Sequence, residues 1–236
     1  KYLLFLENAF PYMDNYNYHK GMKGIIQELK VLLKTKSIGT DSDRALLLDF
    51  QAALETQPEK AIKLEKNALA QIENITADNA RLVSNLHANL GGLYRMNGYP
   101  DLAREHMEKS ISLLDQFNLL HINDSIPQIA NYAMFLTEQQ EPERGISELQ
   151  KLSGIIKEYH SDECLDYAKV QENLATIYLM TANLSQAKTH FKKAFKIYEK
   201  IWADEPEMIE AKYREIQELY PQIGFSIGKT LSGLLT

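Results

Sequence analysis

Three asparagines, Asn89, Asn131 and Asn173, recur in the chain at intervals of 42 residues. An asparagine side chain carries one carbonyl acceptor and one NH₂ donor. Each of these side chains can therefore hydrogen-bond both the N–H and the C=O group of an extended peptide. A row of them would hold a peptide by its backbone, whatever the peptide's sequence.

The asparagines belong to a longer repeat, whose elements must place them equivalently. The same step of 42 residues relates Leu90 to Tyr132 and to Leu174. Agreement at many positions with one fixed spacing indicates a structural repeat. The other positions that follow this step are Gly91, Ala133 and Ala175; Tyr94, Leu136 and Tyr178; Ala61, Ala103, Gly145 and Ala187; Met107, Leu149 and Phe191; and Ala68, Ser110, Leu152 and Ala194.

Apolar residues at helical spacing predict two helices in each repeat. Three second helices begin beside a proline, at Pro58, Pro100 and Pro142, where a missing N–H is harmless. The fourth has Ser185 as its expected N-cap, and the loop 37–43 is expected to cap the helix after it. The predicted helices are Tyr2–Asp14, Tyr18–Lys34, Arg44–Gln57, Glu59–Ile75, Asn79–Asn97, Asp101–Phe117, Ile126–Gln140, Glu143–Tyr159, Asp162–Thr181, Gln186–Ala203, Glu207–Tyr220 and Ile223–Leu235.

Small residues predict where the two helices of a repeat cross. Glycine or alanine stands at Gly91 and its equivalents on the first helix, and at Ala103 and its equivalents on the second. Only small side chains let two helix axes approach at the short end of the roughly 8–10 Å range. We therefore expect these two positions to face each other in every repeat.

The motif resembles the tetratricopeptide repeat. One copy is Leu90, Gly91, Tyr94, Gly98, Ala103, Met107 and Ser110, and a second is Leu174, Ala175, Tyr178, Ala182, Ala187, Phe191 and Ala194. The usual unit has 34 residues. The longer unit of this chain is similar to the repeats of kinesin light chain and of bacterial peptide-sensing regulators. The first repeat of the chain, residues 43–76, departs from the pattern, because it carries Asp49 where glycine or alanine is expected.

The resemblance implies an all-α fold, a right-handed α-α superhelix of about five helical hairpins plus C-terminal capping helices. We expect a single solenoid over residues 1–236. Its parts would be an N-terminal hairpin over 1–36, repeats over 43–76, 78–118, 125–160 and 162–203, and capping helices over 205–236.

The resemblance also implies that the asparagines lie on the first helices and face a concave groove that binds a protein or an extended peptide, without catalysis. Neighbouring first helices lie roughly 10 Å apart, and an extended chain rises about 3.3 Å per residue. One asparagine would therefore meet about every third peptide residue. The expected groove residues besides the three asparagines are Asn85, Arg95, Met96, Met134, Lys169, Glu172 and Thr176.

Other interpretations stay open from the sequence. The asparagines could hydrogen-bond only within the stack of helices, and each charged groove residue could be a solvated surface residue. The chain could also be the ligand-sensing or dimerisation domain of a larger bacterial peptide-responsive regulator, or form a homodimer through its end repeats. An enzyme is the third hypothesis, but no catalytic set is apparent in the sequence.

The composition narrows the range of possible binding partners and locations. The net charge is −6, and no stripe of lysine and arginine stands out, which argues against direct nucleic-acid binding. No apolar run approaches the roughly 20 residues of a membrane span. The single cysteine, Cys164, excludes an intrachain disulfide and favours a reducing, cytoplasmic location. Because the sequence begins with Lys1, we expect it to be a piece of a longer protein.

Two further sequence features do not predict a binding site. Residues 224–230 resemble a phosphate-binding loop, but the spacing is one residue short and no strand precedes it. His106 and His190 occupy equivalent positions two repeats apart, too far to share a metal ion. The sequence therefore predicts no cofactor, no metal site and no catalytic residue.

Overall fold

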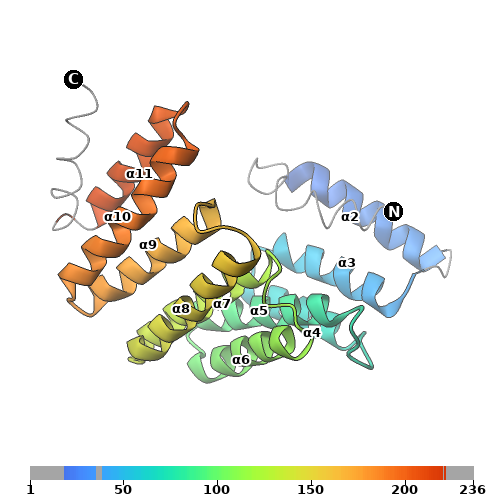
Figure 1. The fold of residues 1–236 in the computed structure, drawn as a ribbon. Coiled ribbons are helices and arrows are strands. Elements are labelled where there is room, and N and C mark those ends of the chain that lie inside the picture. Colours follow the sequence, from blue (N-terminus) through green and yellow to red (C-terminus); the bar gives the residue numbers. More distant parts are fainter. Residues whose placement is uncertain (1–18, 36–38, 220, 222–236) are drawn as a thin grey trace. The chain divides into compact units, whose positions relative to one another are not determined.

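The structure is a computed structural model that describes residues 19–35, 39–219 and 221. All regular elements of these residues are helices, which confirms the predicted all-α class (Figure 1). The predicted helices Tyr2–Asp14 and Ile223–Leu235, and the motif at 224–230, lie outside the described residues. The helices are α2 (His19–Thr35), α3 (Asp41–Ala53), α4 (Pro58–Leu69), α5 (Ala80–Met96), α6 (Pro100–Gln116), α7 (Ser125–Glu138), α8 (Pro142–Tyr159), α9 (Leu165–Met180), α10 (Leu184–Ile201) and α11 (Pro206–Leu219).

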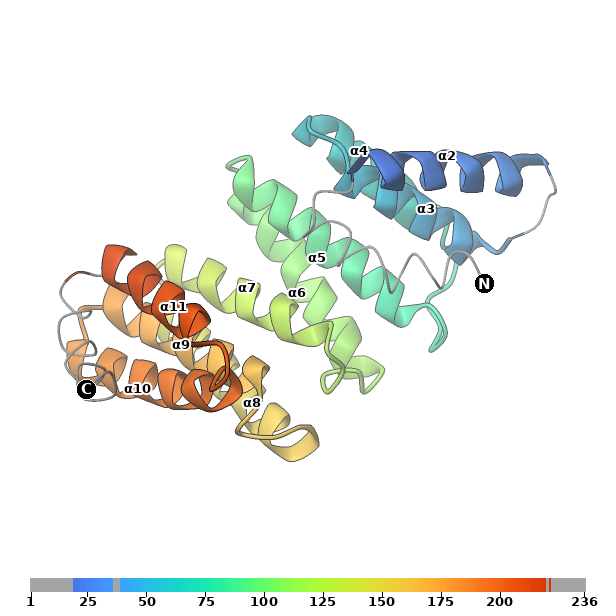
Figure 2. The ribbon, with the colours of Figure 1, turned by 90° about the horizontal axis from the view of Figure 1, so that it is seen from above.

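The chain divides into two compact units between Leu120 and His121. In the first unit, α3 pairs with α4 and α5 pairs with α6. In the second unit, α7 pairs with α8 and α9 pairs with α10, and α11 contacts α10 (Figure 2). Each predicted repeat is thus a helical hairpin. The single solenoid over 1–236 concerns both units together and stays a prediction.

The helix starts follow the predicted capping chemistry at the prolines and differ from it at α3 and α10. Pro58, Pro100 and Pro142 each begin a second helix, as predicted. Helix α3 begins inside the predicted loop, because the Thr40 side chain accepts a hydrogen bond from the Asp43 N–H and the Asp43 carboxylate accepts one from the Thr40 N–H. Helix α10 is capped by Asn183 and not by Ser185.

Helix α4 ends at Leu69, six residues before the predicted end at Ile75. The chain tightens there, because the Ile72 N–H donates to the Leu69 carbonyl three residues back, at 3.0 Å. The side chain of Asn79 then organises the loop, since its carbonyl accepts from the Thr76 N–H and its NH₂ donates to the Asn74 carbonyl. Ile72 packs against the core of the unit. The apolar pattern of the sequence therefore extends beyond the end of α4, because the loop residue Ile72 also packs against the core.

The small residues lie where the hairpin helices cross, as predicted. A methyl group added at Gly91 would lie 2.6 Å from the Met107 Cγ and 3.3 Å from the Ala103 carbonyl oxygen. A methyl group at Gly145 would lie 2.5 Å from the Ala133 carbonyl oxygen of α7. The distances of 2.6 and 2.5 Å are far inside van der Waals contact. The close approach of α5 to α6 and of α7 to α8 thus requires glycine at these two positions.

The turn between the two helices of a hairpin repeats one backbone conformation. Gly98, Gln140 and Ala182 all have positive φ, at 76°, 64° and 57°. They are equivalent residues of successive repeats. A left-handed backbone suits glycine and strains residues with a Cβ atom. The turn geometry is therefore set by the repeat, even where the residue is not glycine.

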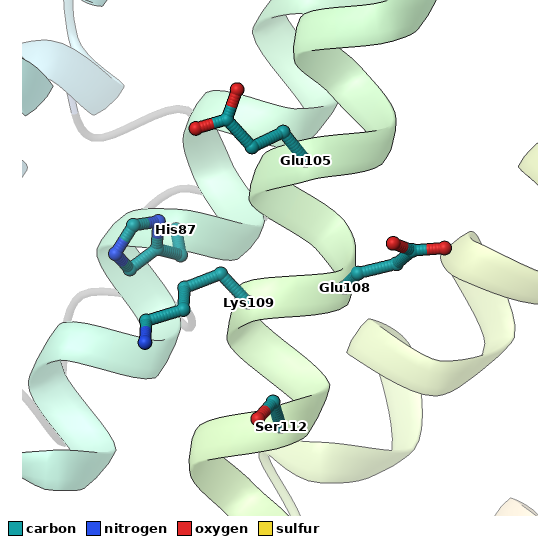
Figure 3. A pocket seen from close by; sticks show the side chains of 5 residues that line it. All are labelled: His87, Glu105, Glu108, Lys109 and Ser112. Atoms are coloured by element: carbon teal, nitrogen blue, oxygen red, sulfur yellow. The ribbon is translucent and has the colours of Figure 1, made fainter.

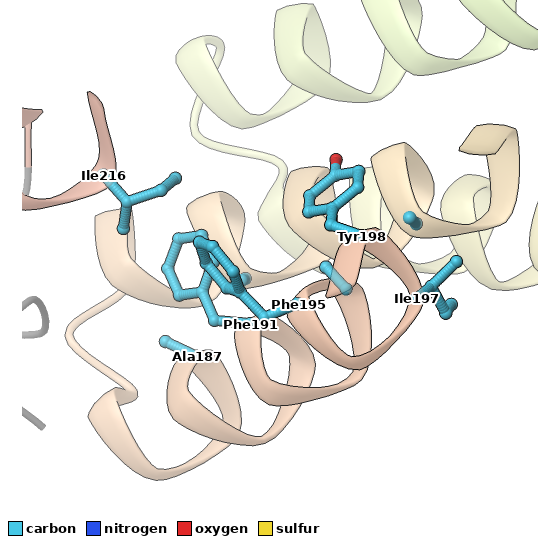
Figure 4. Packing of buried hydrophobic residues seen from close by; sticks show 9 residues of the cluster. Ala187, Phe191, Phe195, Ile197, Tyr198 and Ile216 are labelled. Carbon is cyan, nitrogen blue, oxygen red and sulfur yellow. The ribbon is translucent and has the colours of Figure 1, made fainter. Parts of the chain in front are cut away.

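Each unit has an apolar core of its own. In the first unit, Met22, Ile26 and Leu29 of α2 pack with Leu47 and Phe50 of α3. In the second unit, alanines of α9 and α10 pack with aromatic rings of α10 (Figure 4). Ile216 of α11 lies beside these rings and is 2% exposed, so α11 is anchored to the unit by this side chain.

Candidate functional site

Two of the three repeating asparagines lie on neighbouring first helices of the second unit. Asn131 is exposed on α7, between the buried residues Ala130 and Tyr132. Asn173 is half-buried on α9, which contacts α7. Core packing does not require an amide at either position, because the core is built by the residues beside them. These two side chains remain the main candidates for gripping a peptide backbone.

The other predicted groove residues of this unit have varied surroundings. Met134 is half-buried on α7. Lys169 is exposed and lies 3.9 Å from the Asp166 carboxylate, one turn earlier on α9. The Thr176 hydroxyl donates to the Glu172 carbonyl at 3.1 Å. Neither an exposed ion pair nor a local hydroxyl bond identifies a ligand, so their role in the groove stays a prediction.

The Glu172 side chain connects three helices. It accepts a hydrogen bond from the Tyr198 hydroxyl of α10 at 2.7 Å and forms an ion pair with Lys212 of α11 at 2.7 Å. Burial and the Glu172 charge raise the pKa of Tyr198. Burial alone would lower the pKa of Lys212, but Glu172 and Glu215 outweigh it and raise this pKa. The Glu172 carboxylate thus helps to hold α11 against the unit, a role that the sequence analysis did not foresee.

In the first unit, the predicted groove residues lie on α5. Asn85 and Arg95 are half-buried, whereas Met96 near the turn is 84% exposed. Asn89 is exposed, but both of its hydrogen bonds are made by the NH₂ group. It donates to the Asp49 carboxylate at 2.9 Å and to the Glu65 carboxyl at 3.2 Å. The amide of Asn89 is therefore engaged within the unit, which was one of the two readings open from the sequence.

Glu65 is a buried acid whose pKa is strongly raised. It is 2% exposed on α4. Burial, and then the charge and hydrogen bond of Asp49, raise the pKa of Glu65 to about 10, while the Asn89 hydrogen bond lowers it less strongly. The direction of this shift favours the protonated form of Glu65, whose carboxyl group lies with the Asp49 carboxylate beside the Asn89 NH₂ group.

The repeat spacing of the sequence indicates that Asp49 and Glu65 meet. Asp49 stands at the position of Gly91, and the same step of 42 residues places Glu65 at the position of Met107. Gly91 and Met107 meet at the helix crossing of their repeat. Two acids at the equivalent positions must therefore also meet, and extending the comparison to Met107 would have found them.

A second polar feature lies between α5 and α6. His87 Nδ1 and His106 Nδ1 are 2.9 Å apart, and the His106 ring stacks on Tyr94. Burial, then His106 and Lys109, lower the pKa of His87 to about 4. A pocket of about 430 Å³ opens beside His87, with Glu105, Glu108, Lys109 and Ser112 of α6 along its wall (Figure 3).

The side chains along the His87 pocket extend in different directions (Figure 3). Lys109 and Glu105 extend from α6 on the side of His87, whereas the Glu108 carboxylate points away (Figure 3).

Across 19–35, 39–219 and 221, no three His, Cys, Asp or Glu side chains are arranged to hold a metal ion. In the same residues, no helix has the length and apolar character of a membrane span.

Residues 125–200 match the family model of the tetratricopeptide repeat. This segment belongs to the tetratricopeptide-repeat family. It comprises α7 to α10, so it begins and ends with whole hairpins of the second unit. No curated protein matches the sequence.

Solved structures share the tetratricopeptide fold over more of the chain. BtubC (BKLC) from P. vanneervenii is 19% identical, with a TM-score of 0.63, over 77% of this chain and 72% of that one. The nearly identical TPR-like repeats of a putative kinesin light chain from Podosopora anserina are 15% identical, with a TM-score of 0.63, over 83% and 96%. MamA is 16% identical, with a TM-score of 0.54, over 79% and 94%. At these identities the likeness shows the fold.

Proposed function

We propose that the chain is a non-catalytic interaction protein that binds an extended segment of another protein, held by its backbone on the first helices. The tetratricopeptide fold supports a protein-interaction role. The observation that carries the finer proposal is the pair Asn131 and Asn173, which recur at one repeat position on the contacting helices α7 and α9. An exposed or half-exposed amide that the core does not need is available to a ligand.

The spacing fits a peptide backbone. First helices of neighbouring repeats lie roughly 10 Å apart, and an extended chain advances about 3.3 Å per residue. Asn131 and Asn173 therefore address peptide groups about three residues apart. Each amide offers a donor to a peptide C=O and an acceptor to a peptide N–H, so binding tolerates different peptide sequences.

The test uses a displayed library of random peptides, from which binders of the wild-type chain are selected and measured singly. Asn131→Ala with Asn173→Ala should weaken these binders at least about tenfold, since two pairs of peptide hydrogen bonds are lost. Gln150→Ala, an exposed amide on the second helix α8, is the matched control and should change nothing. Binding that survives the double change, or a library that gives no binder, contradicts the proposal.

A further inference from the structure

The exposed face of α10 carries charge of one sign. Its exposed charged residues are Lys192, Lys193, Lys196 and Lys200. Apolar residues separate most of these lysines in the sequence, but residues three and four apart are neighbours on a helix. The single acid of α10, Glu199, is half-buried and accepts a hydrogen bond from the Tyr213 hydroxyl of α11. Folding thus gathers the lysines into one cationic face, without an exposed acid of the same helix among them.

The repeat does not require lysine at these positions. The step of 42 residues relates Lys200 to Glu158 of α8, and twice this step relates Lys192 to Glu108 of α6. Glu108 forms an ion pair with Arg104, one turn earlier on α6, at 3.9 Å. Charges of both signs along a helix are typical of a solvated face. In α10, lysine replaces the acids of this pattern.

Three of the four lysines lack a counter-charge in the part of the chain that the structure describes. Lys200 forms an ion pair with Glu163, from the loop before α9. Lys192, Lys193 and Lys196 form no ion pair with any described residue. Glu163 therefore shows that a carboxylate can meet one end of the face, and the rest of the face is left for carboxylates from outside the unit.

Two equivalent histidines differ in the charges around them. Burial, and then the charge of Lys193, lower the pKa of His190 on α10. Burial also lowers the pKa of His106 on α6, but there the Glu105 carboxylate acts in the opposite direction. The positive charge on α10 is thus less balanced by nearby acids than that on α6.

We propose that the lysine face of α10, formed by Lys192, Lys193, Lys196 and Lys200, binds an acidic segment of a partner protein. This surface lies on a second helix and does not depend on the asparagine pair of the first helices. Four residues of a helix advance roughly 6 Å, and two residues of an extended chain advance roughly 6.6 Å. A segment with a carboxylate at every second residue therefore matches successive lysines of the face.

The surroundings of the lysine face favour a protein segment over other polyanions. The Phe and Tyr side chains of α10 are buried in the core of the unit, at Phe191, Phe195 and Tyr198 (Figure 4). These rings are therefore not available to stack with the bases of a single-stranded nucleic acid. Their burial also removes the apolar side of the helix from a lipid surface, into which an interfacial helix inserts.

A synthetic acidic peptide is the probe for this face. A short, fluorescently labelled peptide of alternating glutamate and serine is titrated into the chain at low ionic strength, and its fluorescence anisotropy is followed. We expect saturable binding that weakens when salt is added, because salt screens exposed charges. The matching peptide of alternating glutamine and serine should not bind.

Two charge-reversal variants locate the binding. Lys192→Glu with Lys196→Glu should weaken the acidic peptide at least about tenfold, because repulsion replaces attraction at two positions. Lys60→Glu with Lys63→Glu makes the same change in net charge at two exposed lysines of α4, and should leave the affinity nearly unchanged. All four side chains are exposed, and urea unfolding checks that both variants keep the stability of the fold.

Each contrary result has a distinct meaning. Absent binding, or equal weakening by the α4 variant, overturns the inference, since the attraction would then be absent or due to net charge alone. Tighter binding of oligouridine or of anionic phospholipid vesicles would assign the face to another polyanion. Self-association that Lys192→Glu with Lys196→Glu abolishes would assign it to a second copy of the chain. Loss of the acidic peptide with Asn131→Ala and Asn173→Ala, but not with the α10 variant, would place the peptide on the first helices.

Discussion

Glu65 shows how one residue can change the chemistry of a repeat without changing its architecture. Its hairpin keeps Ala45, Ala61 and Ala68 buried, as in an ordinary apolar contact between helices. The acid pair with Asp49 was predictable from the period of 42 residues, because both positions are fixed by Gly91 and Met107. The contact of Asn89 with these two acids was not predictable, since nothing in the sequence says that the Asn89 NH₂ group turns towards the acids and not towards solvent.

Glu65→Gln is expected to stabilise the first unit at neutral pH. The pKa of Glu65 rises from 4.5 in the unfolded chain to about 10 in the folded one. Its protonated form therefore favours folding fully below pH 4.5, and this contribution is lost as pH rises towards 10. Glutamine mimics the protonated acid at every pH. The free energy of unfolding should rise by about 1–3 kcal/mol at pH 7, and hardly change at pH 4.

Urea unfolding of the wild type and of Glu65→Gln at several pH values checks this expectation. The difference between the two curves isolates Glu65, because other titrating groups contribute to both. A difference that does not grow between pH 4.5 and pH 10 would show that Glu65 is ionised in the fold.

The His87 and His106 pair predicts a pH dependence of the opposite sign. The pKa of His87 falls from 6.5 to about 4 in the fold. The neutral ring therefore favours folding above pH 6.5, and this contribution is lost as pH falls towards 4. Gln171 stands at the equivalent position two repeats later and contacts the His190 ring nitrogen at 2.9 Å. His87→Gln should thus fold and lose stability less steeply in acid.

The measurement is the same urea series, read between pH 7 and pH 4 for the wild type and for His87→Gln. His190→Gln, which alters the corresponding contact of the second unit, serves as the comparison. An equally steep loss of stability in wild type and His87→Gln would mean that the ring is already protonated in the fold.

At the scale of the element, the sequence predicted the existence and order of the described helices well, because the apolar period of a helix is strong over 12 or more residues. The sequence predicted helix ends poorly where a side-chain contact outside the apolar pattern determines the end. Helix α4 ends early because Asn79 organises the loop. Helix α9 begins at Leu165, after the predicted start at Asp162, because the Cys164 side chain accepts from the Tyr167 N–H.

Two glycines of one helix, α8, separate the effect of a helix crossing from that of helix propensity. Gly145→Ala should destabilise the second unit by about 1–3 kcal/mol, because the methyl group would meet the Ala133 carbonyl at 2.5 Å. Gly154→Ala meets no atom within 4 Å and should stabilise the helix by up to about 1 kcal/mol. Urea unfolding measures both, and the same sign for the two would refute the close crossing.

The hairpin turns provide a third contrast. Ala182→Gly should stabilise the α9–α10 hairpin by up to about 1 kcal/mol, because glycine relieves the left-handed backbone at φ 57°. Gly98→Ala makes the reverse change at the equivalent turn, where φ is 76° and the added methyl group meets open space. Thermal unfolding of the two variants should shift in opposite directions, and a lower melting temperature for Ala182→Gly would contradict the shared turn geometry.

At the scale of the molecule, the period of 42 residues determines most of what could be foreseen. Crossings and turns repeat because equivalent residues of successive hairpins meet the same local constraints. The features that escaped prediction are contacts made by long polar side chains, such as Glu172 with Lys212 and Asn89 with Glu65. Such side chains have several directions open to them, and only the packed structure selects one.

The most direct test of backbone binding is a scan of a selected peptide in which single peptide N–H groups are methylated. Each methyl group removes one donor without changing the side chain. We predict affinity losses that recur about every three residues and that are absent in the Asn131→Ala, Asn173→Ala chain. A loss that follows particular side chains, or that is equally large in the variant, would contradict the proposal that these two asparagines hold the peptide by its backbone.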